Sequence, residues 1–339
     1  IAPKPRARTE SEKYYLTARL EKRQPLPDIS DEPSCTLSVV VPAYNETERM
    51  PSMLHETVSY LESRKLKDQT FQYEIIVVDD GSTDGTSKTA LKYGQINPHV
   101  DLRVLTLEKN RKKGGAVTQG ILSSRGKNIL FADADGATKF SDHEILEKRL
   151  LEVIDKNGFG VAVGSRAHLV NTEVVVKLFT RKSALHIFHN MHVEGWIFDI
   201  EVLLIAQYFN MPIVEVPVTW HEIDGSKVSL IKDSIKMAID LLTIRLCYLS
   251  RFWSIHEPIL RLKRNYLTGV TLESSIAADI RNTGKIDNLE SRKLSIRASY
   301  SIYSISCITH HYVIRVTGND IGVLKQFPQW NFPLVVQSL

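Results

Sequence analysis

The sequence has 339 residues, of which 43% are hydrophobic and 24% are charged. This composition supplies enough apolar material for a packed core and excludes a disordered tail or a fibre. Its 43 Lys and Arg residues against 39 Asp and Glu residues give a net charge of +4. That balance is too mild to indicate a nucleic-acid partner, which calls for a concentrated basic stripe, so we expect none. No apolar run approaches the roughly 18 residues of a membrane-spanning helix.

The first 34 residues are charged and carry several prolines without a sustained hydrophobic period. This pattern predicts a linker over residues 1–34. The chain opens at Ile1 without an initiator Met, so we expect the linker to follow an N-terminal membrane anchor that lies outside this sequence. Three scattered cysteines form no CxxC pair, which favours a reducing compartment over a zinc site or a disulfide framework.

From Leu37 onward, buried apolar strands alternate with amphipathic helices. Strands are predicted over residues 37–41, 73–78, 102–107, 128–132, 160–164, 174–180 and 213–219, and helices over 51–61, 86–93, 116–123, 142–154 and 198–208. Such alternation predicts an α/β fold with a Rossmann-like, mostly parallel sheet and helices on both faces. In these sheets ligands bind where the strands end at their carboxyl edge.

Three acidic clusters each stand at the end of a predicted strand: residues 42–46 (PAYNE), 79–85 (DDGSTDG) and 133–136 (DADG). Carboxylates gathered at strand ends are costly unless a cation or hydrogen-bond donors occupy the site. In the third cluster, the spacing of two places Asp133 and Asp135 on one face, within reach of a single hard cation if the strand continues. Mg²⁺ or Mn²⁺ held there would bridge to a substrate diphosphate. One such pair alone is more typical of a structural turn, and the three clusters together change that balance.

Together these motifs resemble glycosyltransferase family 2, whose members are inverting nucleotide-sugar enzymes with a GT-A fold. The resemblance rests on residues 39–46 (VVVPAYNE), 76–84 (IVVDDGSTD) and 133–136 (DADG), and covers about residues 35–253. Residues 109–116 (KNRKKGGA) and 164–169 (GSRAHL) are similar to the branch that glycosylates polyprenyl phosphates. That branch implies transfer of glucose from UDP-glucose to dolichyl phosphate for protein N-glycosylation. A mannosyl transfer from GDP-mannose stays open, because the shared motifs do not read the base or the sugar.

The resemblance also implies roles for individual residues. Nucleotide contacts are assigned to Pro42, Tyr44, Glu46 and Asp133, and contacts to uracil and ribose are assigned to Asp79 or Asp80. Asp135 is assigned as the metal ligand, and Lys113, at the start of a helix, as a phosphate contact. Arg166 is expected to contact phosphates of the donor or the acceptor, and Asp199 is the candidate general base.

Each of these residues also has a plainer interpretation. Pro42 ends a strand, Tyr44 packs, the 79–84 segment forms a tight turn, and Arg166 lies on the surface. The glycine pair after Lys113 is equally typical of a turn. A phosphate acceptor that is already ionised needs little deprotonation. Instead of acting as a general base, Asp199 could therefore position the acceptor or cap the helix predicted over residues 198–208. His186, His189 and His192 recur every three residues, a pattern of helix-surface histidines more than of a metal site.

The chain departs from the family pattern at three places. A segment on the acceptor side is missing near residues 170–176, Lys112 replaces an expected glycine, and residues 254–339 form an atypical tail. The glycosyltransferase domain is therefore expected over residues 35–229 with an internal deletion. Two hypotheses follow: an active transferase, or a protein that binds the nucleotide sugar and transfers it poorly or not at all.

Residues 230–253 place apolar side chains at helical spacing, with Lys232, Lys236, Arg245 and Arg251 on the remaining surface. This pattern fits an amphipathic helix in a membrane interface, with Tyr248 and Trp253 as anchors. It fits a helix packed on the domain core equally well. The family resemblance implies the endoplasmic reticulum membrane, with the catalytic domain facing the cytosol.

Overall fold

The computed structural model describes residues 5–165, 174–221, 230–258, 304–309, 312–317 and 320–325. The chain divides into two compact units, Ile1–Leu262 and Lys263–Leu339, which are described separately.

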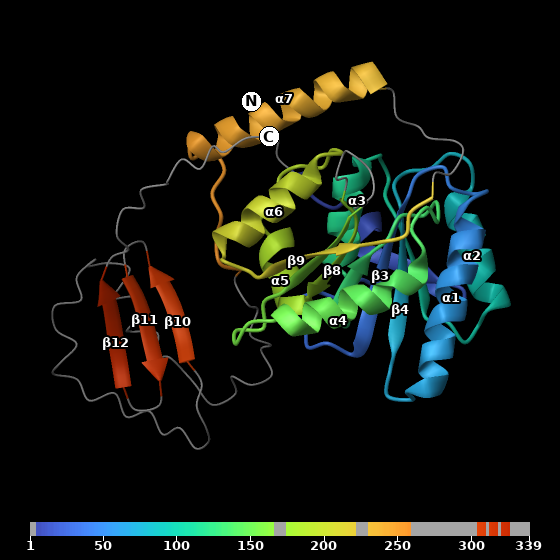
Figure 1. The fold of residues 1–339 in the computed structure, drawn as a ribbon, viewed down its shortest axis with the longest axis horizontal. Coiled ribbons are helices and arrows are strands. Elements are labelled where there is room, and N and C mark those ends of the chain that lie inside the picture. The colour runs from blue at the N-terminus through green and yellow to red at the C-terminus, as the bar shows by residue number, and fades with distance from the viewer. Residues whose placement is uncertain are drawn as a thin grey trace. The chain divides into compact units, whose positions relative to one another are not determined.

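The first unit is built on a nine-stranded sheet in the order β2-β1-β5-β4-β3-β6-β8-β7-β9. Four of these strands, β3, β4, β8 and β9, are labelled in Figure 1. Its strands are β1 (Tyr14–Thr17), β2 (Leu20–Pro25), β3 (Cys35–Ala43), β4 (Tyr73–Asp79), β5 (Leu102–Thr106), β6 (Gly126–Phe131), β7 (Val161–Ser165), β8 (Val174–Thr180) and β9 (Ile213–Pro217). At its centre β5, β4, β3 and β6 run parallel. The sheet as a whole is mixed, because β8 runs against both of its neighbours and β1 against both of its own.

Helices cover both faces of this sheet. They are α1 (Met50–Lys67), α2 (Thr86–Ile96), α3 (Lys112–Ile121), α4 (His143–Val153), α5 (Arg181–Phe188), α6 (Phe198–Tyr208) and α7 (Leu230–Leu249), with short 3-10 turns at Ser11–Lys13 and Phe140–Asp142. One core gathers Leu54 of α1 and Leu146 of α4 against the sheet. The other gathers Val117 of α3 and Val202 of α6 on the opposite face. The predicted α/β fold with helices on both faces is confirmed.

The prediction of a linker over residues 1–34 is wrong for its central part. β1 and β2 form an antiparallel hairpin, and Leu16 of β1 pairs with Val104 of β5, so the hairpin extends the main sheet. The strands gave no sequence signal because they are short and lie at an edge. Edge strands such as β2 (LEKRQP) are commonly protected by charged residues and proline rather than marked by apolar runs.

The helix predicted near residues 230–253 is present as α7, and one side of it packs on the domain. Ile244, Cys247 and Trp253 are buried in the core that also contains α6. The Tyr248 hydroxyl donates a hydrogen bond to Glu201 Oε1 at 2.8 Å. Of the two interpretations that the sequence leaves open for Tyr248 and Trp253, these contacts support packing on the domain core and not membrane anchoring. None of the described helices has the length and apolar run that a bilayer crossing requires.

Most of the segment in which the internal deletion was expected lies outside the described residues. The strands on either side are defined: β7 ends at Ser165, β8 begins at Val174, and these two residues are paired. In the second unit, β10 (Ser304–Thr309), β11 (Tyr312–Thr317) and β12 (Asp320–Lys325) form an antiparallel sheet in that order. It belongs to the tail that follows residue 254.

Candidate active site

The three acidic clusters follow neighbouring parallel strands. β4, β3 and β6 are adjacent in the sheet, so the loops after Asp79, Ala43 and Phe131 emerge at one edge. The Asp80 N–H donates to the Ala43 carbonyl at 2.8 Å, which fixes the first two loops side by side. The predicted placement of the clusters at strand ends is confirmed.

The first loop carries Tyr44 at the surface and Glu46 nearly buried. Tyr44 is 41% exposed, and Pro42 is the penultimate residue of β3. The Glu46 carboxylate forms an ion pair with Arg49, whose Nε lies 2.8 Å from Glu46 Oε2. Arg49 carried no signal in the sequence, since a single arginine immediately before a helix is common on protein surfaces.

The two aspartates of the second cluster differ in what they contact. Asp79 accepts hydrogen bonds from the N–H groups of Ser82 and Ser87, at 2.9 and 3.1 Å, so its carboxylate holds its own turn and the start of α2. Asp80 is buried and accepts from the Arg111 N–H at 2.6 Å. Burial raises the pKa of Asp80 to about 7, because the backbone N–H bonds from Arg111 and Lys112 do not offset the loss of solvent and the nearby charge of Asp79 adds to the upward shift.

The third cluster pairs each of its aspartates with a cation. Lys113 Nζ lies 2.8 Å from Asp133 Oδ1, and Arg49 Nη1 lies 4.0 Å from Asp135 Oδ2. Burial acts to lower the pKa of Lys113, but Asp133 and Asp199 outweigh it and the pKa is raised. Burial and the neighbouring charge of Asp133 raise the pKa of Asp135. This corner of the sheet therefore holds two carboxylates that repel one another and a lysine that partly neutralises them.

Behind this cluster lies an ion pair that sequence reasoning missed. Lys177 of β8 has a fully buried side chain, and its Nζ lies 2.6 Å from Asp199 Oδ1 at the start of α6. The same ammonium group lies 5.1 Å from the ring centroid of Phe131 and 5.5 Å from that of Phe198. Burial lowers the pKa of Lys177, and Asp199 opposes that shift. The N-cap of α6 is Ile197 and Asp199 lies in the first turn, so Asp199 is not the cap residue and its carboxylate is the counter-ion of Lys177.

The glycines after Lys113 permit close packing. A Cβ on Gly114 would meet Phe198 at 2.5 Å, and one on Gly115 would meet Arg111 at 2.5 Å. Lys112, which replaces the expected glycine, has a φ of +65°. That left-handed conformation explains why glycine suits the position.

Two remaining sets of sequence candidates have different outcomes. Arg166 lies outside the described residues. The three histidines do not converge: His186 bonds to the Lys182 carbonyl, His189 to the Leu185 carbonyl, and His192 to Glu201. The interpretation of all three as helix-surface residues is wrong, because His186 is buried and α5 ends at Phe188, before the other two.

The residues present suit a divalent cation held jointly with a diphosphate. Within the described parts of the chain, no three His, Cys, Asp or Glu side chains gather into a complete metal shell. Mg²⁺ typically takes one or two carboxylates from the protein and completes its shell with phosphates and water. The pair Asp133 and Asp135, with the raised pKa of Asp135, fits that mode because a cation would relieve their mutual repulsion.

Comparisons with known proteins agree with this site. The family model described as Glycosyl transferase family 2 matches residues 38–202. A Homo sapiens protein named dolichyl-phosphate beta-glucosyltransferase is 46% identical over 282 residues, covering 74% of this chain and 87% of that protein. The Saccharomyces cerevisiae protein of the same name is 41% identical over 278 residues, covering 68% and 80%. The chain belongs to glycosyltransferase family 2. Within that family it is similar to the dolichyl-phosphate beta-glucosyltransferases.

Two solved structures are similar at lower identity. S. aureus TarS 1-349 is 20% identical with a TM-score of 0.39, over 53% of this chain and 58% of that one. The mannosyltransferase PcManGT from Pyrobaculum calidifontis, in complex with GDP-Man and Mn2+, is 17% identical with a TM-score of 0.41, over 57% and 58%.

Proposed function

We propose that the protein transfers glucose from UDP-glucose to dolichyl phosphate with inversion, giving dolichyl beta-D-glucosyl phosphate for protein N-glycosylation. The observation that carries the proposal is the convergence of Asp80, Asp133, Asp135 and Lys113 at the carboxyl edge of adjacent parallel strands. A nucleoside diphosphate needs such an edge, with donors for its phosphates and carboxylates for its metal. The names of the similar enzymes supply the sugar and the acceptor.

The chemistry asks little of a base. A phosphate oxygen of the acceptor attacks the sugar C1, the bond between C1 and the diphosphate oxygen breaks, and UDP leaves with the bonding electrons. A phosphate monoester has a second pKa of about 6 and is largely ionised at pH 7. The ammonium group of Lys113 can attract that anion, while Lys177 and Asp199 neutralise one another behind it. In this proposal Asp199 holds the ammonium group of Lys177 near the acceptor and is not required as a general base.

A divalent cation belongs to the same proposal. Asp135 would hold Mg²⁺ or Mn²⁺, with Asp133 on the nucleotide side. When bound, the cation neutralises the diphosphate and makes it a better leaving group. Pro42, Tyr44 and Glu46 line the first loop, from which they would contact the nucleotide, and Asp80 would contact uracil and ribose. We propose that Arg166 contacts the phosphates from the end of β7.

The acceptor side favours a second candidate function, nucleotide-sugar binding with little transfer. Ser165 of β7 and Val174 of β8 are paired, so residues 166–173 alone join the two strands, whereas the family resemblance implies a longer connection at this place. The alignment with the human relative spans 282 positions but covers 74% of 339 residues here, about 251. Positions of that relative therefore lack a counterpart in this chain. Since positioning of two substrates supplies much of the barrier reduction, we expect turnover to be slow.

Transfer in detergent separates the two candidates. The chain is incubated with radiolabelled UDP-glucose, Mn²⁺ and dolichyl phosphate, and lipid-soluble label is counted against an Asp135→Asn control. We expect slow, inverted lipid product that increases when the human segment is inserted between Leu169 and Lys177. If the chain binds UDP-glucose but forms no lipid product, with or without the insertion, glucosyl transfer is refuted and nucleotide-sugar binding is the function that remains.

We also propose that α7 rests on the cytosolic face of the endoplasmic reticulum membrane. Ile244 and Cys247 of the helix are buried on the domain, and six other large apolar side chains of the helix are exposed: Met237, Ile239, Leu241, Leu242, Leu246 and Leu249, with Phe252 following. Arg245 and Arg251 are exposed beside them. An apolar face flanked by cations is typical of a helix in an anionic membrane interface.

Flotation on vesicles containing anionic lipid tests this surface. In Leu242→Gln/Leu246→Gln, two side chains that are about half exposed become polar. Complete burial of a leucine side chain contributes about 1.5–3 kcal/mol. If the membrane buries the exposed half of each of the two leucines, the pair contributes about 2 kcal/mol, so we expect the substitutions to weaken membrane partitioning roughly thirtyfold. The matched control Ile145→Gln/Leu151→Gln alters exposed apolar residues of α4. Equal loss of flotation in both variants would refute a specific role for α7.

A further inference from the structure

The segment before β1, residues 5–13, contacts the loop between β5 and α3. Its centre is Glu12, whose side chain is fully buried. The Glu12 carboxylate accepts hydrogen bonds from Arg6 Nη2 at 2.6 Å, Arg111 Nη2 at 2.9 Å and the N–H groups of Thr9 and Glu108 at 3.1 and 3.0 Å. Such a carboxylate organises both segments that it bonds to. Its pKa is lowered, because these bonds outweigh the effect of burial.

Arg111 is the partner through which this carboxylate reaches the site. Its side chain is 1% exposed, and its guanidinium donates to the Ala7 carbonyl at 2.9 Å and also bonds the Arg6 carbonyl and Glu194. Glu12 is a further partner of this guanidinium. All of its partners except Glu194 therefore belong to the N-terminal segment. A guanidinium held in this way has one orientation, since moving it would leave a buried charge unpaired.

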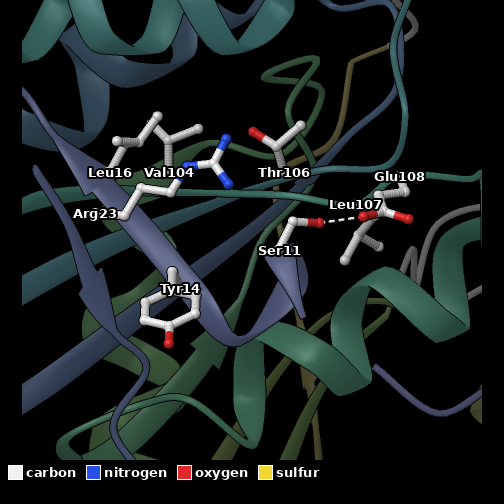
Figure 2. A pocket seen from close by; sticks show the side chains of 8 residues that line it. All are labelled: Ser11, Tyr14, Leu16, Arg23, Val104, Thr106, Leu107 and Glu108. Carbon is white, nitrogen blue, oxygen red and sulfur yellow. Dashed lines mark hydrogen bonds between the residues drawn. The ribbon is translucent and has the colours of Figure 1, made fainter. Parts of the chain in front are cut away.

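Further bonds attach the same segment to the loop and to α3. Ser11 Oγ donates to Glu108 Oε1, and Figure 2 shows this bond at the rim of a surface hollow that Tyr14 and Arg23 also line. Arg8 Nη2 donates to the Gln119 carbonyl at 3.0 Å and to Ser123 Oγ at 2.8 Å. The N-terminal segment is therefore part of the folded domain along its length.

The loop that is held contacts one donor-site residue, Asp80, and leads directly into another, Lys113 of α3. The Arg111 N–H donates to Asp80 Oδ1 at 2.6 Å, and Lys113 follows two residues later with its bond to Asp133. The backbone at Gly81 also lies against this loop, since a Cβ there would come within 3.1 Å of the Asn110 nitrogen. Loss of the Glu12 contacts would move Asp80 and Lys113 together.

We infer that Glu12 is a positioning residue of the donor site, which acts through Arg111 to hold Asp80 and Lys113 in the arrangement that receives a nucleoside diphosphate. The inference rests on the proposed function. It gives the N-terminal segment a role in substrate binding that its composition did not indicate.

The test compares Glu12→Gln with Glu10→Gln in the full chain. Glu10 lies two residues away and pairs with Lys13, and its side chain is 85% exposed. We expect Glu12→Gln to weaken UDP-glucose binding, measured by calorimetry with Mn²⁺ well below the melting temperature, by tenfold or more. Glu10→Gln should leave the affinity unchanged. Arg6→Gln removes one bond from the same carboxylate and should weaken UDP-glucose binding two- to fivefold. This milder variant keeps the test valid if Glu12→Gln fails to fold.

Amide hydrogen exchange distinguishes positioning from general stability and needs no donor. We expect Glu12→Gln to speed exchange in residues 108–113, the Arg111 amide included, and to leave the strands at the centre of the sheet unchanged. Unchanged donor affinity, or exchange that rises equally over the whole first unit, would overturn the inference. Absence of UDP-glucose binding by the unsubstituted chain would refute the proposed function, while the exchange pattern would still decide whether Glu12 holds the loop.

Discussion

The buried ion pair between Lys177 and Asp199 gives the sharpest energetic prediction. Asp199→Asn keeps the shape of the side chain and removes its charge, which leaves the fully buried ammonium of Lys177 without its counter-ion. Breaking a buried pair in this way costs about 3–5 kcal/mol. Because the Asp199 side chain is 25% exposed, we expect the lower value, about 3 kcal/mol at pH 7.

The loss should depend on pH with a definite sign. Burial already lowers the pKa of Lys177, and Asp199 opposes that shift, so without Asp199 the folded-state pKa falls further. The unfolded chain then binds more protons than the folded chain, and stability rises with pH until the unfolded lysine titrates near 10.4. The destabilisation by Asp199→Asn should therefore shrink between pH 7 and pH 10.

Urea unfolding of four chains measures the coupling: the unsubstituted chain, Asp199→Asn, Lys177→Met and the double variant. We expect the double variant to recover about 2 kcal/mol relative to the sum of the single changes. Glu152→Gln, which breaks the exposed pair with Arg149, should change stability by less than about 0.5 kcal/mol. Additive single effects, or a loss that is the same at both ends of the pH range, would show that the two side chains do not compensate one another.

Other residues of the site and its loops give four further predictions. Asp135→Ala should abolish the dependence of UDP-glucose binding on Mn²⁺, measured by calorimetry, and equal affinity of the unsubstituted chain with and without the cation would contradict the metal assignment. Asp80 has a folded pKa of about 7, above its unfolded value, so the stability it contributes is complete below about pH 4 and is lost as pH rises through 7. Relative to the unsubstituted chain, the free energy of unfolding of Asp80→Asn should therefore rise by about 4 kcal/mol between pH 4 and pH 8, measured by denaturant unfolding. Asp80→Ala should weaken UDP binding, whereas Asp84→Ala, which removes the acceptor for the Thr86 N–H, should cost about 1 kcal/mol of stability and leave affinity unchanged. Lys112→Gly should raise stability by about 0.5–1 kcal/mol, since the left-handed φ of +65° no longer strains a side chain; an unchanged or lower melting temperature would contradict this.

The sequence predicted the centre of the fold because the strands there carry their own signal. All seven residues of β4 are buried, and a strand buried on both faces is a continuous apolar run that a sequence displays directly. The acidic clusters were predictable for a related reason, since they interrupt those runs at the point where each strand ends.

The residues that sequence reasoning missed depend on distant partners. Lys177 sits in a strand as an isolated charge, and its partner Asp199 lies in a different element. Glu12 contacts Glu108 and Arg111, nearly a hundred residues along the chain. Tyr248 carries an amphipathic signature that is satisfied equally by lipid or by Glu201. Local composition cannot distinguish these cases, because the tertiary contact alone decides whether a charge or a hydroxyl is buried.

Donor competition tests the central claim most directly. With Mn²⁺ present, UDP-glucose is titrated into the full chain by calorimetry, alone and against saturating UDP or GDP-mannose, and the titration is repeated without the cation. We predict binding that requires Mn²⁺, is abolished by UDP and is little affected by GDP-mannose. If GDP-mannose displaces UDP-glucose and UDP does not, the site prefers GDP-mannose and the chain is a mannosyltransferase. If UDP-glucose binds under none of these conditions, there is no nucleotide-sugar site at this edge of the sheet.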